Sequence, residues 1–130
     1  MSIADFSEIL SQLRGEIESR LREEFSGPSN AGKRILYDMA TPIYLNTVGD
    51  SQEFNLEFLA GGSVQLHTGL SPNPDVTVKG DLASLSDAVL QRSSQAFQEA
   101  EQKGRIVVTG HTWKGQQAMK KVRELLTSNP

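Results

Sequence analysis

The sequence predicts a single α+β domain in which helices cover a five-stranded, mainly antiparallel sheet. Three observations lead to this prediction. Apolar residues recur every three or four positions over the first 26 residues, apolar and polar residues alternate in the middle of the chain, and the last third reads strand, helix, strand, helix with glycines at the joints. At 130 residues, the chain has the length of one domain with a sizeable core.

Residues 1–26 are predicted to form one long helix with a single apolar stripe. Gly15 weakens it by about 1 kcal/mol relative to alanine, and Ser26–Asn30 ends it and turns the chain. We expect the stripe to cover one face of the sheet. The alternative is that the helix, about 36 Å long, also forms the contact of a homodimer. The stripe consists of Ile3, Phe6, Ile9, Leu10, Leu13, Ile17 and Leu21.

Residues 33–79 are predicted to hold four strands. The first runs from Arg34 to Thr41, where apolar and polar residues alternate. Pro42 bends or breaks it, because proline cannot donate a hydrogen bond within a sheet, and residues 43–48 extend it. The others are expected at 52–60, 63–68 and 75–79, with Gly61 and Gly62 as the turn of a hairpin.

The last third is predicted to contain helices over 81–103, a strand over 105–109 and a helix over 112–127. Asp81 or Ser84 can cap the first of these helices. The run Ile106–Val108 is apolar on both faces, which is typical of a strand covered from both sides. The final helix carries an apolar stripe at helical spacing, formed by Gly115, Ala118, Met119, Val122, Leu125 and Leu126.

Composition excludes several kinds of function. The net charge of −3 argues against nucleic acid as the main partner, because phosphate binding needs clustered lysines and arginines. With no cysteine, thiolate catalysis and thiolate metal sites are excluded. The first residues lack the basic start of a signal peptide and the last lack a peroxisomal address, so we expect a cytoplasmic protein.

Motifs for chemistry are absent or incomplete. The segment Gly27–Lys33 fits the spacing of a phosphate-binding loop, but Arg34 stands where serine or threonine would bind magnesium. His67 and His111 lie on different predicted elements without metal-ligand spacing, so we expect no metal site. We therefore expect no cofactor and no enzymatic activity.

The last third, taken in order, resembles the sterol carrier protein type-2 family. The residues that carry the resemblance are Asp75-Val76-Thr77-Val78, Ala96-Phe97, the glycine-flanked strand 105–109 and Ala118-Met119-Lys120. The resemblance extends over nearly the whole chain, with longer segments after Phe97 and at 111–115. It implies an apolar cavity between sheet and helices and non-catalytic binding, with possible transfer, of a hydrophobic small molecule: a fatty acid, phospholipid, isoprenoid or sterol.

The resemblance places a tunnel between the layers of the fold. Its expected gate is the final helix with residues 111–115. The alternative function is a protein-interaction or dimerisation module that serves a lipid-acting enzyme and has no open cavity. The expected lining residues are Leu56, Phe58, Leu66, Val76, Val78, Leu85, Val89, Phe97, Ile106, Val108, Met119 and Val122.

Trp113 leaves two interpretations open. It either folds back over the sheet or the pocket, or it anchors the protein transiently at a membrane surface, with its indole at headgroup depth. In the second case Lys114, Lys120 and Lys121 would meet anionic lipid.

Overall fold

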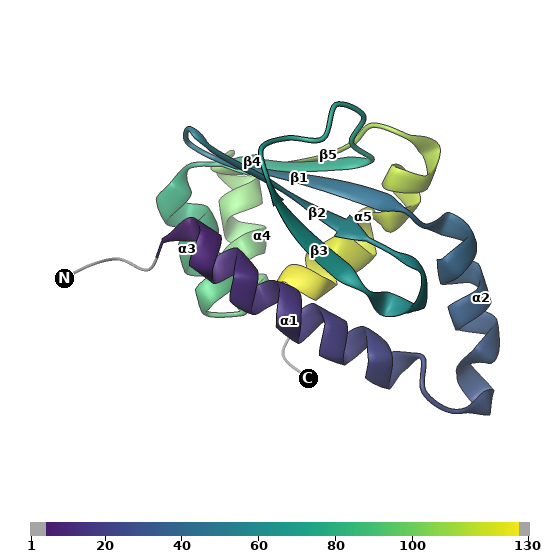
Figure 1. Cartoon of the computed structure of the whole chain (residues 1–130). Coiled ribbons are helices and arrows are strands. Elements are labelled where there is room, and N and C mark those ends of the chain that lie inside the picture. Colours follow the sequence, from purple (N-terminus) through teal and green to yellow (C-terminus); the bar gives the residue numbers. More distant parts are fainter. Residues whose placement is uncertain (1–4, 128–130) are drawn as a thin grey trace.

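The computed structural model describes residues 5–127, and Figure 1 shows their arrangement. Helices and strands follow one another along the chain in nearly the predicted order. The helices are α1 Phe6–Glu24, α2 Ala31–Ala40, α3 Leu82–Leu90, α4 Ser94–Gln102 and α5 Trp113–Thr127, and the strands are β1 Ile43–Gly49, β2 Gln52–Phe58, β3 Val64–Thr68, β4 Val76–Gly80 and β5 Ile106–Gly110. Short 3₁₀ turns, Pro28–Asn30 and Ala60–Gly62, join α1 to α2 and β2 to β3.

The five strands form one sheet in the order β3-β2-β1-β4-β5. Neighbouring strands run antiparallel except β1 and β4, which are parallel and in register from Leu45 opposite Val76. The predicted five-stranded, mainly antiparallel α+β fold is therefore confirmed. The parallel pair joins a meander, β1 to β3, to the β-α-α-β unit of the last third.

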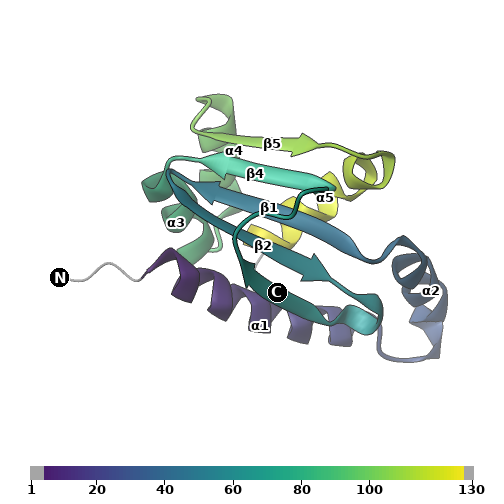
Figure 2. The ribbon, with the colours of Figure 1, turned by 45° about the horizontal axis from the view of Figure 1, so that its top comes forward.

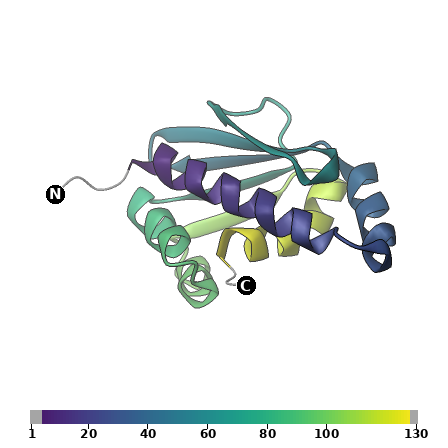
Figure 3. The same cartoon turned by 60° about the horizontal axis from the view of Figure 1, so that its bottom comes forward.

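Helices α1, α3, α4 and α5 form a layer on one face of the sheet (Figures 2 and 3). The opposite face is polar, and the loop between β3 and β4 is fastened to it. Asn46 donates to the carbonyl of Ser71 and accepts from its backbone N–H, and Asn55 donates to the carbonyl of Gly69. The apolar core therefore lies between the sheet and the helical layer.

The apolar stripe of α1 is buried against this core, as predicted. Six of its residues, from Phe6 to Leu21, are at most 3% exposed, and the ring of Phe6 meets that of Phe54 edge-on at 5.9 Å between centroids. Ile3 and the rest of residues 1–4 lie outside the described residues. Because the stripe packs within the chain, a homodimer through α1 would have to use its polar face, and that contact stays a prediction.

The predicted strand from Arg34 to Thr41 is wrong, because this segment is helix α2. Ile35, Tyr37 and Met39 alternate over too short a run to distinguish a strand from a helix. In the helix Tyr37 and Ala40 pack against the core, and the ring of Tyr37 meets that of Phe25 at 4.9 Å between centroids. Proline disfavours a helical conformation in the residue before it, so Thr41 is extended and the strand begins only after Pro42.

The last third follows the prediction closely. Of the two candidate caps for α3, Asp81 is the cap: its carboxylate accepts from the N–H of Ser84 at 2.8 Å. The hydroxyl of Ser93 caps α4 in the same way through the N–H of Ala96. Capping oxygens satisfy N–H groups that have no partner within the helix, which fixes where each helix starts.

Candidate functional site

The twelve residues predicted to line a tunnel gather in one core between sheet and helices. Nine are fully buried, and Leu66, Val108 and Met119 are partly buried against the same cluster. The structure thus brings the set together as packed side chains. Their role as ligand contacts stays a prediction.

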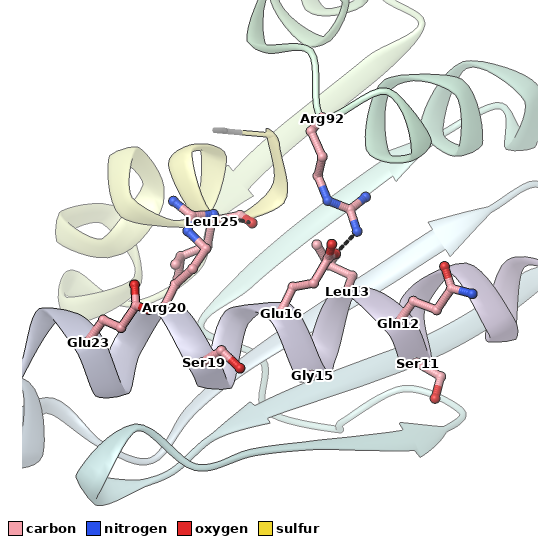
Figure 4. Close-up of a pocket in the computed structure, with 10 residues that line it drawn as sticks. All are labelled: Ser11, Gln12, Leu13, Gly15, Glu16, Ser19, Arg20, Glu23, Arg92 and Leu125. Atoms are coloured by element: carbon pink, nitrogen blue, oxygen red, sulfur yellow. Dashed lines mark hydrogen bonds and ion pairs between the residues drawn. The ribbon is translucent and has the colours of Figure 1, made fainter. Parts of the chain in front are cut away.

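A groove of about 660 Å³ runs through the helical layer above this core. It separates α1 from the C-terminal end of α5 and from the turn between α3 and α4, and Figure 4 shows its side chains. The volume lies within the range of about 300–1,000 Å³ typical of small-molecule sites. The lining residues are Ser11, Gln12, Leu13, Gly15, Glu16, Ser19, Arg20, Glu23, Arg92 and Leu125.

The groove combines an apolar base with a polar rim. Leu13 and Leu125, both at most 4% exposed, belong to the core and line the groove as well. The rim is supplied by the polar side of α1, which turns away from the sheet. Gly15 lies in the middle of this side, and a Cβ built on it would meet no heavy atom within 4 Å. The groove is therefore open at the position where the helix carries no side chain.

Arg92 spans the groove from the α3–α4 turn. Its backbone has a φ of 50°, in the left-handed region that favours glycine. Its guanidinium bonds the carbonyl of Val89 and the carboxylate of Glu16 on α1 (Figure 4). The side chain is only 17% exposed, and this burial lowers the pKa of Arg92 from its ordinary value, although a guanidinium stays charged at neutral pH.

Arg20 closes the other part of the rim, where α1 meets α5. It donates to the carbonyl of Leu125 at 3.4 Å, one of the last carbonyls of α5, which have no partner within the helix. The groove thus carries two arginines, balanced by Glu16 and Glu23. An apolar base beside fixed charges suits an amphiphilic molecule better than a purely polar one.

Neither the groove nor Arg92 was predicted from the sequence. One signal was available: Arg92 follows helix 82–90 at the place where a glycine commonly ends a helix. A long polar side chain there instead indicates that the side chain itself is used. Gly15, in the middle of a long helix, was a second signal of the same kind.

The start of α5 is held firmly by Asp75, which is 3% exposed. The Asp75 carboxylate accepts from the N–H of Tyr44 at 2.9 Å and the hydroxyl of Thr112 at 2.8 Å. Its carbonyl accepts from the N–H of His111 at 2.8 Å, and the Thr112 hydroxyl also accepts from the N–H of Gly115 at 2.9 Å. The segment predicted as a gate is therefore tied to β4 and β1.

The four residues predicted for membrane contact lie on two sides of α5, Trp113 with Lys120 and Lys114 with Lys121, because residues seven apart share a side of a helix. Trp113 is 78% exposed, so it does not fold over the sheet. Lys114 donates to the carbonyl of Pro42 at 2.8 Å, whereas Lys121 pairs with Glu24 of α1 at 2.6 Å. Lys120 lines a separate pocket between α4 and α5, which also contains Phe97 from the predicted lining set.

The histidines stand apart on the polar face of the sheet. His67 lies 2.9 Å from a carboxylate oxygen of Glu57, and His111 lies 2.7 Å from the hydroxyl of Thr77. Within residues 5–127 no three histidine, aspartate or glutamate side chains are grouped to hold a metal ion. Over the same range no helix is long and apolar enough to cross a bilayer.

Comparison with solved structures identifies the fold. A solved ubiquinone synthesis protein, UbiJ-SCP2, superposes with a TM-score of 0.56 at 16% identity, over 99% of both chains. The fold is that of sterol carrier protein type-2. The family resemblance seen in the sequence is thus confirmed at the level of the fold.

Two further structures with the sterol carrier fold are similar at lower scores. Sterol carrier protein 2 from Yarrowia lipolytica, in its apo form, gives a TM-score of 0.46 at 13% identity over 98% of both chains. The palmitated SCP2L2 from Aedes aegypti gives 0.46 at 17% identity over 95% of this chain and 96% of that one. No protein-family model and no curated protein sequence matches the chain.

Proposed function

We propose that this sterol carrier domain binds a lipid or another hydrophobic small molecule without transforming it, and that the groove between α1 and α5 is where the ligand enters. The observation that supports this is the position of the groove directly over the core, with Leu13 and Leu125 lining both. Removing an apolar chain from water contributes about 25 cal/mol per Å² of buried surface, so no catalytic group is required for binding.

Entry requires the C-terminal end of α5 to move away from α1, which breaks the bond of Arg20 to the Leu125 carbonyl and the ion pair of Lys121 with Glu24. The opposite end is tied to Asp75 through Thr112 and His111. A shift that begins beyond Gly115 opens the groove toward Val122 and Met119, two of the predicted lining residues. The apolar part of the ligand then contacts the core, while a polar head stays at the rim beside Arg20 and Arg92.

The ligand class follows from the shape of the site and from the fold. The groove offers both an apolar base and charged side chains, so we expect an amphiphile such as a fatty acid, a phospholipid or an isoprenoid with a polar head. The similar protein is named for ubiquinone synthesis, which makes an isoprenoid quinone or its precursor the first ligand to examine.

The test uses Gly15, because it offers a way to fill the groove without touching the core. In Gly15→Phe the aromatic ring occupies the open space found at this position. The matched control is Gly15→Ala, which adds one methyl group and leaves the groove largely free. Uptake of a fluorescent acyl probe is measured for both variants and for the unmodified protein, and native mass spectrometry identifies lipid that co-purifies with each.

We expect the unmodified protein and Gly15→Ala to bind the probe with similar affinity and Gly15→Phe to bind it at least tenfold more weakly. A molecule that co-purifies with the first two proteins and is absent from the third would be identified, by its mass, as the ligand. Equal uptake of the probe by all three proteins would exclude the groove as the site of entry. Absence of probe and lipid from the unmodified protein would contradict lipid binding and favour the interaction module.

A further inference from the structure

A second cavity, of about 640 Å³, lies where α1 begins. It is lined by Asp5 and Phe6 of this start, by Asp50 and Gln52 around the turn between β1 and β2, and by five residues of α3. Figures 1 and 3 show these three segments at one end of the molecule. We call this space the α3 cavity. It shares no lining residue with the groove between α1 and α5, so the two sites are separate.

The floor of the α3 cavity is apolar and closely packed. Phe6 is 3% exposed, and Leu82 packs against the same core. Gly49 lets the turn approach both side chains: a Cβ built on it would lie 2.8 Å from Cδ1 of Leu82 and 3.5 Å from Cε2 of Phe6. Leu90, which is 50% exposed, lies two turns beyond Leu82 on the same side of α3. An apolar body that covers these side chains gains from leaving water.

The rim of the α3 cavity is acidic. It holds Asp5, Asp50 and Asp87, and among the residues of 5–127 that line it none is lysine, arginine or histidine. The positive ends of α1 and α3 are balanced by Asp5 and Asp81, the residues that precede these helices. Asp50 and Asp87 have no such balance. Within residues 5–127 neither forms an ion pair, and the one hydrogen bond to either carboxylate comes from the neutral amide of Gln91, at 2.7 Å from Asp87.

Ser86 adds a buried polar group without a partner. It lines the α3 cavity and is only 8% exposed, and its hydroxyl makes no hydrogen bond to any residue within 5–127. A buried hydroxyl ordinarily finds a partner, and within a helix this is often the carbonyl four residues earlier. Ser86 lies midway between Leu82 and Leu90, one turn from each. Its free oxygen can therefore accept a hydrogen bond from a ligand that covers the apolar floor.

We propose that the α3 cavity binds an organic cation, a molecule with an apolar body and a protonated amine. The body covers Phe6, Leu82 and Leu90. The ammonium group donates to the hydroxyl of Ser86 and faces the carboxylates of Asp50 and Asp87. In a site partly closed to water the effective dielectric constant is lower, so this attraction is stronger than between the same charges in solution.

A metal ion or a partner protein fits the α3 cavity less well. Over residues 5–127 no three carboxylate or histidine side chains are grouped to hold an ion, so the aspartates surround the cavity without converging on one point. A stable protein interface takes about 20–30 residues from each side. The volume of the cavity instead falls within the range of about 300–1,000 Å³ typical of small-molecule sites.

The experiment compares three probes with the same apolar chain and different charge: octylammonium, octanol and octanoate. Each is titrated into the full chain at low salt, and two-dimensional ¹H–¹⁵N NMR spectra show where it binds. The amides of Ala83 and Ser86 report on the α3 cavity, and those of Gly15 and Ser19 report on the groove. We expect octylammonium to bind the cavity about tenfold more tightly than octanol and octanoate to leave its amides unshifted. Added salt should weaken the binding of octylammonium, because it screens partly exposed charges.

The variant D50N/D87N removes the two uncompensated charges and keeps the local structure. Asparagine tolerates the left-handed backbone of residue 50, where φ is 54°, and at residue 87 its oxygen can still accept from Gln91. The matched control is E99Q/E124Q, which removes two charges from α4 and α5, outside the α3 cavity. We expect D50N/D87N to bind octylammonium about tenfold more weakly, with its affinity for octanol unchanged, and the control to bind both normally.

The variant S86A tests the hydroxyl separately. We expect it to bind octylammonium about threefold more weakly, because one hydrogen bond to the ligand is lost. Its midpoint of unfolding should not fall, because the hydroxyl that is removed has no partner within residues 5–127. A lower midpoint with unchanged affinity would show that Ser86 serves the fold and not the ligand.

The α3 cavity does not depend on the groove being a ligand site. Gly15→Phe fills the groove and should leave the shifts caused by octylammonium unchanged. Three results would overturn the proposal: equal affinity of the cavity for all three probes, equal binding of octylammonium by D50N/D87N and its control, or shifts confined to the groove. If far-UV circular dichroism shows that D50N/D87N is unfolded, the comparison of the three probes on the unmodified protein decides.

Discussion

At the scale of single residues, Asp75 and Gly115 together position the final helix. Asp75 is buried yet charged, and its carboxylate is satisfied by the N–H of Tyr44 and the hydroxyl of Thr112. Gly115 lies directly against the Asp75 backbone. A buried carboxylate is stable only with such partners, so the same contacts that satisfy the charge fix α5 to the sheet.

Replacing Gly115 by alanine tests this close approach. A Cβ at this position would lie 2.0 Å from the Asp75 carbonyl oxygen, which cannot withdraw without losing its bond to His111. We expect Gly115→Ala to lower the free energy of unfolding by about 3 kcal/mol, the upper end of the usual cost of overpacking. Urea denaturation measures it. The control is Gly32→Ala, where a Cβ has open space; equal midpoints for the two variants would contradict the prediction.

Glu18 links α1 to the edge of the sheet and gives stability a dependence on pH. The N–H of Val64, at 2.9 Å, and the guanidinium of Arg14, at 2.8 Å, hold the pKa of Glu18 below its ordinary value of 4.5, against the opposing effect of burial. A carboxylate whose pKa is lowered by folding contributes stability above its unfolded pKa. That stability is lost as the pH falls through the folded pKa.

We therefore expect Glu18→Gln to lower the free energy of unfolding by about 1 kcal/mol at pH 7, because a charged hydrogen bond is replaced by a neutral one. The difference in the free energy of unfolding between the two proteins should shrink as the pH falls from about 5 toward 3, because Glu18 of the unmodified protein becomes neutral as well. Thermal unfolding across this range measures it. A difference that stays constant with pH would show that the charge of Glu18 contributes nothing.

At the scale of elements, the sequence allowed most helices and strands to be predicted, and the one error has a physical cause. The stripe of α1 and the alternation in β2 are long enough for their period to be unambiguous. In the segment 31–40 the large aliphatic side chains are exposed rather than buried, so the assumption that apolar residues face a core misplaced it.

Replacing Gly15 by alanine should stabilise α1. Gly15 lies in the interior of the helix with open space at its Cβ, so alanine there loses less conformational freedom on folding and meets no clash. We expect Gly15→Ala to raise the free energy of unfolding by about 1 kcal/mol. Urea denaturation checks this value, and an unchanged or lower midpoint would mean that the glycine is needed for the local shape of the helix.

At the scale of the whole molecule, the fold could be predicted and the groove could not. The order of elements in the last third matched a known family, and nine of the twelve expected lining residues are buried, as their periodicity indicates. The groove depends instead on how far α1 lies from α5 and from the turn that carries Arg92. No spacing within the sequence encodes such distances between helices, because they result from the packing of the complete core.

The bonds between α1 and β3 have a consequence for solubility. Strand β3 lies at one end of the sheet order, and an edge strand with free N–H and C=O groups invites pairing with other chains. At Val64 both groups are occupied, the N–H by Glu18 and the carbonyl by Arg14. The long helix therefore covers part of this edge against pairing with other chains, and protonation of Glu18 in acid would weaken that cover.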